Sequence, residues 1–382
     1  MALVVGAAAF LTVWNPFERV DHVAWEGDFD KLLADLARGY ANFELRDVRA
    51  PRDLEERTRR TIREAGTNRV AREAILQYVD AWHDPHLRVD GRRSMPAFLR
   101  GKRFLRLDLP RERTLALANG RRAGVLRISS FEGESLEAMR SRLRQLEAAL
   151  ERIKRHDVDV LLIDITGNGG GTDWAEAAAR MVAAKPLQCN EVGYVRHRHH
   201  VSRMEDDLAR IKEDLARADV PPGQRALLEQ AAAKLRSLIG GGEFLIRGSG
   251  CGLLNYAAPG TLAGLKSAEV LYEPERLRWA EGVWTGRLAV LIDGGTASAA
   301  EWFASILRDN DAATLLGQRT MGAGCGYTDG GIQSNLPHSG MRVRMPDCAR
   351  FRANGENEVI GIEPDVPVSS LTELAHALGH LR

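Results

Sequence analysis

Apolar residues recur at helical spacing in the first part of the chain. Two stripes, between about residues 28 and 82, repeat every three or four positions. They consist of Phe29, Leu32, Leu33, Leu36 and Tyr40, and of Val70, Ala74, Ile75, Tyr78, Val79 and Trp82. This spacing places apolar side chains on one face of an α-helix. It predicts an N-terminal helical unit, which we bound at residues 21–95.

The pattern then changes to alternating strands and helices. Short apolar, β-branched runs typical of buried strands are separated by an amphipathic helix and by glycine-rich turns. The predicted elements are strand 124–129, helix 136–153, strand 158–165, strand 288–292, helix 298–307 and strand 314–316. This order predicts an α/β core within residues 96–382.

Two charged, Leu-rich stretches interrupt this core. Residues 201–217 and 224–239 are separated by Pro221-Pro222-Gly223, a strong turn signal. They predict a helical hairpin within an insertion at about residues 190–260. Its role as a lid, a docking arm or a purely structural insert stays open.

The N-terminus carries one apolar run, residues 2–14. Its 13 residues are fewer than the roughly 20 that span a bilayer. The run matches the hydrophobic part of a secretion signal or a clipped anchor, and a buried strand or helix is the alternative. We treat residues 1–20 as a separate segment and expect a periplasmic or otherwise extracytoplasmic protein. Membrane association through residues 2–14 stays open.

Composition narrows the possible partners. The chain of 382 residues is 44% hydrophobic and 27% charged, which excludes a disordered chain and a polytopic membrane protein. Its 53 basic and 52 acidic residues leave a net charge of +1, so we expect no nucleic-acid partner. The four cysteines form no CxxC pair, and we interpret the histidine-rich run 196–200 as an exposed basic segment. We therefore expect no metal and no cofactor.

Two glycine-rich turns join a strand to a helix. The first spans residues 164–171, where successive glycines leave N–H groups free to face an anion. The second contains Ser298 at the start of a predicted helix, whose N–H groups and dipole would stabilise an oxyanion. The alternatives are a tight turn without a ligand for the first, and an N-cap role for Ser298.

A serine nucleophile needs a base. The histidine candidates are His83, His86 and His338. Of these, His86 lies just after a predicted helix in the sequence His-Asp-Pro-His, where the proline would stiffen the turn.

Four segments in order resemble the carboxy-terminal processing peptidase and tricorn-type serine peptidase family. The segments are Asp84-Pro-His86, Asp164-Ile-Thr-Gly-Asn-Gly-Gly-Gly171, Thr296-Ala-Ser-Ala-Ala-Glu301 and Gly361-Ile-Glu-Pro-Asp365. The resemblance covers roughly residues 30–370. It implies a crotonase-like α/β core of ββα units preceded by a helical bundle. It also implies that Ser298 is the nucleophile and that the N–H groups of Gly170 and Ala299 form the oxyanion hole.

The chain departs from the processing peptidases at the base. Their lysine position holds Ala323 here, which excludes a Ser–Lys dyad at that place. The tricorn-type branch uses a histidine from the first motif and a glutamate shortly before the last. By that resemblance His86 is the base and Glu358 orients or charge-stabilises its imidazole. Glu356 and Glu363 are rivals for that role.

Further expectations follow from this comparison. Fewer than forty residues separate His86 from the strand at 124, too few for the PDZ domain of processing peptidases. Cys325 lies beside the lysine position, so a bond to Cys348 would staple the active-site loop, and Cys189–Cys251 would close the insert. Four reduced, buried cysteines are the alternative.

Together these features predict an exported serine peptidase without a PDZ module. It would cleave peptides or unfolded protein through an acyl-enzyme intermediate. One alternative is a non-catalytic ligand- or protein-binding member of the same scaffold. The other is an acyl-CoA enzyme of the crotonase type. Homo-oligomer formation stays open.

Overall fold

The computed structural model describes residues 19–91, 113–117, 120–172, 174–249, 280–328 and 330–381, together with Leu105, Leu107 and Leu109. The N-terminal helices are α1 (His22–Gly39), α2 (Arg46–Arg49), α3 (Arg52–Arg63) and α4 (Asn68–Ala81), with a 3-10 turn at Phe43–Leu45 between α1 and α2. Asp21 and Thr67 cap the first turns of α1 and α4. The predicted stripes are buried except at Leu33, which is half-buried, and at Val70, which is exposed in the first turn of α4.

A six-stranded mixed sheet forms the centre of the fold, in the order β12-β8-β7-β4-β3-β2. Its strands are β2 (Arg113–Ala116), β3 (Arg122–Arg127), β4 (Val160–Asp164), β7 (Arg287–Ile292), β8 (Thr314–Gly317) and β12 (Val366–Pro367). All neighbours are parallel except β2 and β3. The α/β prediction is confirmed as a mixed α/β fold with a mixed central sheet; the crotonase-like description stays a prediction.

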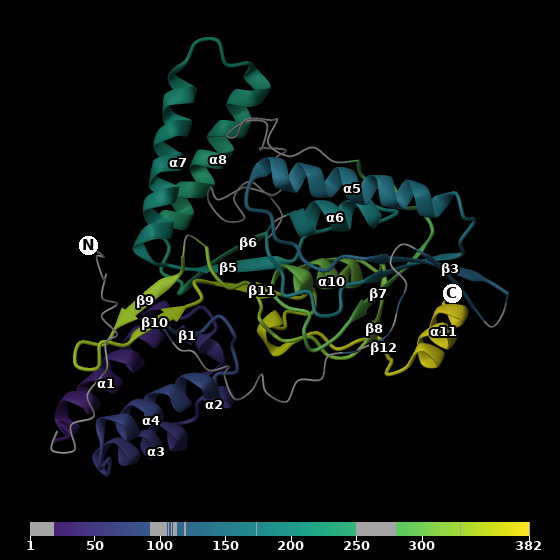
Figure 1. Ribbon diagram of the computed structural model, residues 1–382. Helices are drawn as coiled ribbons and strands as arrows, with labels where there is room; N and C mark the ends of the chain where they lie inside the picture. Colours follow the sequence, from purple (N-terminus) through teal and green to yellow (C-terminus); the bar gives the residue numbers. More distant parts are fainter. Residues whose placement is uncertain are drawn as a thin grey trace, which may run out of the picture.

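Both faces of this sheet are apolar and covered. Alternate residues of β4 point to opposite sides: Leu161 and Ile163 belong to one core, Val160 and Leu162 to the other. Helices α5 (Leu136–Lys154), α6 (Trp174–Val182) and α10 (Ala299–Asp309) cover the first face, and α11 (Leu371–His380) the second (Figure 1). Burial on both sides explains the continuous apolar runs in the sequence.

Two small antiparallel sheets adjoin the centre. One has the order β1-β10-β9, from Arg88–Val89, Arg342–Met345 and Ile332–Asn335. Ile332, Val343 and Met345 of this sheet share a core with the N-terminal helices, which lie beside it in Figure 1. Strands from the C-terminal part of the chain thus contribute to the hydrophobic core of the N-terminal unit. The boundary of this unit at residue 95 stays a prediction.

The other small sheet carries the inserted hairpin. Its order is β11-β5-β6, from Cys348–Phe351, Glu191–Val195 and Leu245–Ser249. Between β5 and β6 the chain forms α7 (Arg198–Ala216) and α8 (Pro222–Gly240), which project from the body as a pair (Figure 1). Met204, Ile211 and Leu235 lie in an apolar core of this pair. The predicted helical hairpin is confirmed.

Among the described helices, none is long and apolar enough to cross a membrane. The apolar run 2–14 lies outside the described residues.

Candidate functional site

The two glycine-rich turns meet at one edge of the central sheet. They follow β4 and β7, which are parallel neighbours with Asp164 opposite Leu291. The Asp293 carboxylate accepts the Gly167 N–H at 2.8 Å, and the Ala297 N–H donates to the Asn168 carbonyl at 2.9 Å. Because the carboxyl ends of parallel strands lie at the same edge of the sheet, two turns that are far apart in sequence are brought into direct contact.

Ser298 lies between β7 and α10 in a strained conformation. Its φ of 55° and ψ of −120° belong to a region that residues with a Cβ rarely adopt. The next residue, Ala299, begins α10, and its N–H donates to no acceptor in the described part of the chain. A sharp strand-to-helix turn with a strained serine beside a free helix N–H matches the arrangement of a nucleophile elbow.

Gly170 lies directly against this serine. A Cβ on Gly170 would come within 2.8 Å of the Ser298 Cβ and of the Ala299 nitrogen. The predicted oxyanion donors are therefore neighbours. The Gly170 N–H, however, donates to the Asn168 side-chain oxygen at 2.9 Å and is engaged in this conformation.

His86 is held by its own turn and by the 323–327 segment. Asp84 is buried and accepts hydrogen bonds from the His86 N–H, the Tyr40 hydroxyl and the Asn42 amide. The His86 Nδ1–H donates to the Ala323 carbonyl at 2.9 Å, which leaves the Nε2 lone pair free. Burial lowers the pKa of this imidazole below its ordinary value of 6.5, although the Asp84 carboxylate opposes the change. Neutral His86 can therefore accept a proton at Nε2.

Glu301 ties these parts together. Its buried carboxylate accepts the N–H groups of Ser298 at 2.9 Å and Ala323 at 2.8 Å, and also those of Gly322 and Gly324. Burial and the negative charge of Glu358 raise the pKa of Glu301 to about 7. One side chain thus joins the serine turn to the segment whose carbonyl holds His86. No direct hydrogen bond joins the Ser298 hydroxyl to His86 in the described structure.

Glu358 is buried in the same cluster, but its partner is Arg350. The expectation that Glu358 contacts the imidazole is not met in this conformation, because Ala323 occupies Nδ1 and the guanidinium attracts the carboxylate. Arg350 Nε donates to Glu358, and Arg350 Nη2 donates to the carbonyls of Ser298 at 3.1 Å and Gly324 at 2.9 Å.

The rival glutamates lie at the surface. The Glu356 carboxylate accepts from the Asn354 amide, and Glu363 pairs with Arg319 at 3.1 Å. Of the three candidates, only Glu358 is buried beside the serine turn.

No role was predicted from the sequence for Asp84, Glu301 or Arg350. A signal existed for Glu301, since it follows Ser298 by three residues, the spacing of a capping box. Asp84 precedes Pro85 and His86, a typical setting for an Asx turn. No local pattern identifies Arg350, because its partners come from three separate segments.

One predicted disulfide is present, between Cys325 and Cys348 with Cα atoms 5.6 Å apart. Cys189 is also disulfide-bonded, whereas its predicted partner Cys251 lies outside the described residues. The histidine run is exposed only in part: residues 197 and 198 are exposed as expected, whereas His200 is only 3% exposed.

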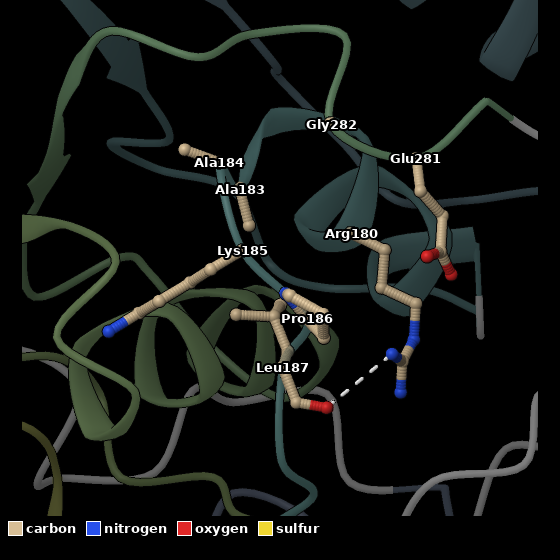
Figure 2. A pocket seen from close by; sticks show the side chains of 8 residues that line it. All are labelled: Arg180, Ala183, Ala184, Lys185, Pro186, Leu187, Glu281 and Gly282. Atoms are coloured by element: carbon tan, nitrogen blue, oxygen red, sulfur yellow. Dashed lines mark hydrogen bonds between the residues drawn. The ribbon is translucent and has the colours of Figure 1, made fainter.

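A separate cavity opens beside the end of α6. Figure 2 shows its lining, which consists of Arg180, residues 183–187 and residues 281–282, with the Arg180 guanidinium donating to the Leu187 carbonyl at 3.5 Å. None of the predicted site residues lines it. The candidate site is therefore the sheet edge around Ser298 rather than this cavity.

The fold and site define a class: a mixed α/β protein with a strained serine at a helix N-terminus and a half-buried imidazole on a segment joined to it through Glu301, an arrangement compatible with hydrolase chemistry. The model of Peptidase family S41 matches residues 122–368, and the chain belongs to this family.

Solved structures share the fold. The crystal structure of mature CPAF is 15% identical, with a TM-score of 0.60 over 90% of this chain and 93% of that chain. A protein of Parabacteroides merdae ATCC 43184 is 16% identical, with a TM-score of 0.53 over 93% of this chain and 96% of that one. The comparison with curated protein sequences gave no match.

Proposed function

We propose that this protein is a serine peptidase in which Ser298 is the nucleophile and His86 the base. Membership of a peptidase family supports the reaction class. The observation that carries the residue assignment is the hydrogen bond from His86 Nδ1–H to the Ala323 carbonyl at 2.9 Å. It selects the tautomer whose Nε2 can take the proton of a serine hydroxyl.

The reaction proceeds in two halves. The Ser298 Oγ attacks the scissile carbonyl carbon while its proton passes to His86 Nε2, and the carbonyl oxygen becomes an oxyanion. His86 then gives this proton to the leaving amine, and the C–N bond breaks to form the acyl-enzyme. Water attacks the acyl-enzyme in the same way, with His86 first accepting and then returning the proton to Ser298.

The N–H groups of Ala299 and Gly170 stabilise the oxyanion in this proposal. The Ala299 N–H has no acceptor in the described part of the chain, whereas the Gly170 N–H is bound by the Asn168 oxygen. The substrate oxygen must therefore replace Asn168 as the acceptor. Asn168 would act as the stand-in acceptor when no substrate is bound.

Glu358 acts as a positioning residue rather than as a direct partner of the imidazole in the conformation described. Its ion pair orients Arg350, which donates to the carbonyls of Ser298 and Gly324. Removing the carboxylate would leave a buried guanidinium without its counter-ion, which would destabilise the folded protein.

The substrate and location form part of the same proposal. The proposed substrates are peptides or unfolded protein, which the protein binds without a PDZ module. The proposed core is crotonase-like, and the proposed location is outside the cytoplasm. The Cys325–Cys348 disulfide supports an oxidising compartment, and the 26 residues between His86 and β2 support the missing module.

A fluorophosphonate probe tests the proposal directly. We expect one covalent adduct, mapped to Ser298, which disappears in Ser298→Ala and falls strongly in His86→Ala. His156→Ala, at an exposed position, is the matched control and should label normally. Circular dichroism confirms that the variants are folded. Absence of labelling in the wild-type protein, where a control serine hydrolase reacts, would favour the non-catalytic binding protein.

A further inference from the structure

Two histidines and an aspartate converge at the base of the hairpin, outside the candidate peptidase site. His199 and His200 lie in the first turn of α7, and Asp347 lies between β10 and β11. The Asp347 Oδ2 is 2.9 Å from His199 Nε2 and 3.5 Å from His200 Nε2. One ligand atom from each of the three lies within 4.8 Å of the others.

The charge of this cluster favours a cation. Asp347 is wholly buried, and in the described part of the chain its ion-pair partners are the two imidazoles. A buried carboxylate thus faces two imidazole nitrogens, and a cation bound between these groups would neutralise its charge.

The side chains of the cluster are themselves oriented by neighbours. The His199 Nδ1 lies 2.7 Å from the His197 Nδ1, so His197 can accept the Nδ1–H when Nε2 binds a metal. The Asp347 Oδ1 accepts the Thr328 N–H at 2.7 Å, and Oδ2 accepts the Thr328 hydroxyl at 2.7 Å. Such outer hydrogen bonds are what fixes the tautomer and direction of ligands in protein metal sites.

We propose that His199, His200 and Asp347 bind a divalent transition metal ion, Zn²⁺ or one of similar chemistry. Two imidazole nitrogens and one carboxylate oxygen suit Zn²⁺ better than Mg²⁺ or Ca²⁺, which prefer oxygen ligands. Metal–ligand bonds of about 2.0–2.1 Å in a tetrahedron place ligand atoms about 3.3 Å apart. The observed separations of 2.9 and 3.5 Å lie on either side of that value. Water would take the fourth position.

The ion would join the hairpin to the part of the chain beside His86. The Val195 N–H donates to the Asp347 carbonyl at 2.8 Å, and the Asp347 N–H donates to the Gly326 carbonyl at 3.2 Å. Gly326 in turn lies against the His86 ring. Metal binding would therefore fasten the start of α7 to the segment that supports the proposed base, independently of whether the protein is a peptidase.

Metal titration of the chelator-treated, full-length protein tests this site. We expect one equivalent of Zn²⁺ by calorimetry, and visible absorption typical of tetrahedral Co²⁺ when Co²⁺ is added instead. His200→Ala and Asp347→Asn should each weaken Zn²⁺ binding by at least about 100-fold, because each removes a direct ligand. The matched control, His156→Ala, changes an exposed histidine just after the end of α5 and should bind Zn²⁺ like the wild type.

The half-buried His199 offers a milder variant if the buried positions do not tolerate substitution. His199→Ala should then weaken binding to the same degree. The proposal is overturned if the wild-type protein binds neither Zn²⁺ nor Co²⁺ stoichiometrically. It is equally overturned if folded His199→Ala binds both ions as tightly as the wild type, because the cluster would then be only a hydrogen-bonded network.

Discussion

Gly170→Ala tests the close approach of the two glycine-rich turns. The new Cβ would lie 2.7 Å from the Ala297 carbonyl oxygen and 2.8 Å from the Ala299 nitrogen and the Ser298 Cβ. Two of these three atoms belong to the backbone and cannot move aside by side-chain rotation. The residue also has a φ of +97°, where an L side chain is strained whatever the space.

The expected cost combines two effects. Backbone strain at such a φ contributes about 1–3 kcal/mol. Overpacking against a rigid neighbour contributes about 1–3 kcal/mol more. We therefore expect Gly170→Ala to lower the free energy of unfolding by about 2–6 kcal/mol. Displacement of Ser298 by a fraction of an ångström to one ångström should slow fluorophosphonate labelling by roughly 100-fold.

Gly169→Ala is the matched control for this variant. It lies in the same turn, but a Cβ there would meet no atom within 4 Å, and its φ is not in the left-handed region. Its free energy of unfolding should change by no more than about 1 kcal/mol. Urea denaturation followed by circular dichroism gives the stabilities, and the labelling rate reports on Ser298. If Gly170→Ala matches Gly169→Ala in both measurements, the packing argument is wrong.

Three further predictions concern the surroundings of the base. Gly326→Ala places a Cβ 2.9 Å from the His86 Nε2 and should lower kcat. Gly330→Ala has a similar positive φ but open space around its Cβ, and should leave kcat unchanged. Equal kcat values for the two variants would contradict the proposed role of His86. Because His86 must be neutral to accept a proton and its pKa is lowered, kcat/KM should fall on acidification only below pH 6.5. A limb centred above that value would argue against His86 as the base. Replacing Cys325 and Cys348 by serine removes a cross-link between residues 23 positions apart and should lower the free energy of unfolding by about 3 kcal/mol. Urea denaturation measures this change, and an unchanged midpoint would refute the prediction.

Much of the fold follows from local pattern. The helical stripes, the apolar runs of β4 and β7 and the hairpin turn at residues 221–223 each produced the expected element, with boundaries shifted by a few residues. These features depend on the spacing of apolar side chains and on turn-forming residues, and both can be recognised within a short stretch of sequence. Val70 was wrongly predicted to be buried: it lies in the first turn of α4 and is exposed.

The candidate site was predictable only in part. Ser298, Gly170 and His86 belong to motifs whose glycines, proline and helix start are visible in the sequence. The partners of each group were not visible. Arg350 rather than the imidazole pairs with Glu358, and the Ala323 carbonyl rather than a carboxylate accepts the hydrogen bond from the His86 imidazole Nδ1–H. A buried polar group forms its hydrogen bonds with whichever polar groups lie next to it in the folded protein. Those neighbours come from distant segments, so the packing of the whole chain determines them.

The sequence by itself therefore determined the helices, the buried strands, the two glycine-rich turns and the order of motifs that marks the peptidase family. Only the tertiary structure decided which groups meet. Parallel pairing of β4 with β7 brings Gly170 to Ser298, and the β10–β11 junction brings Asp347 to His199 and His200. A repeating pattern specifies an element and its buried face, whereas contacts between distant segments arise only when those faces pack together.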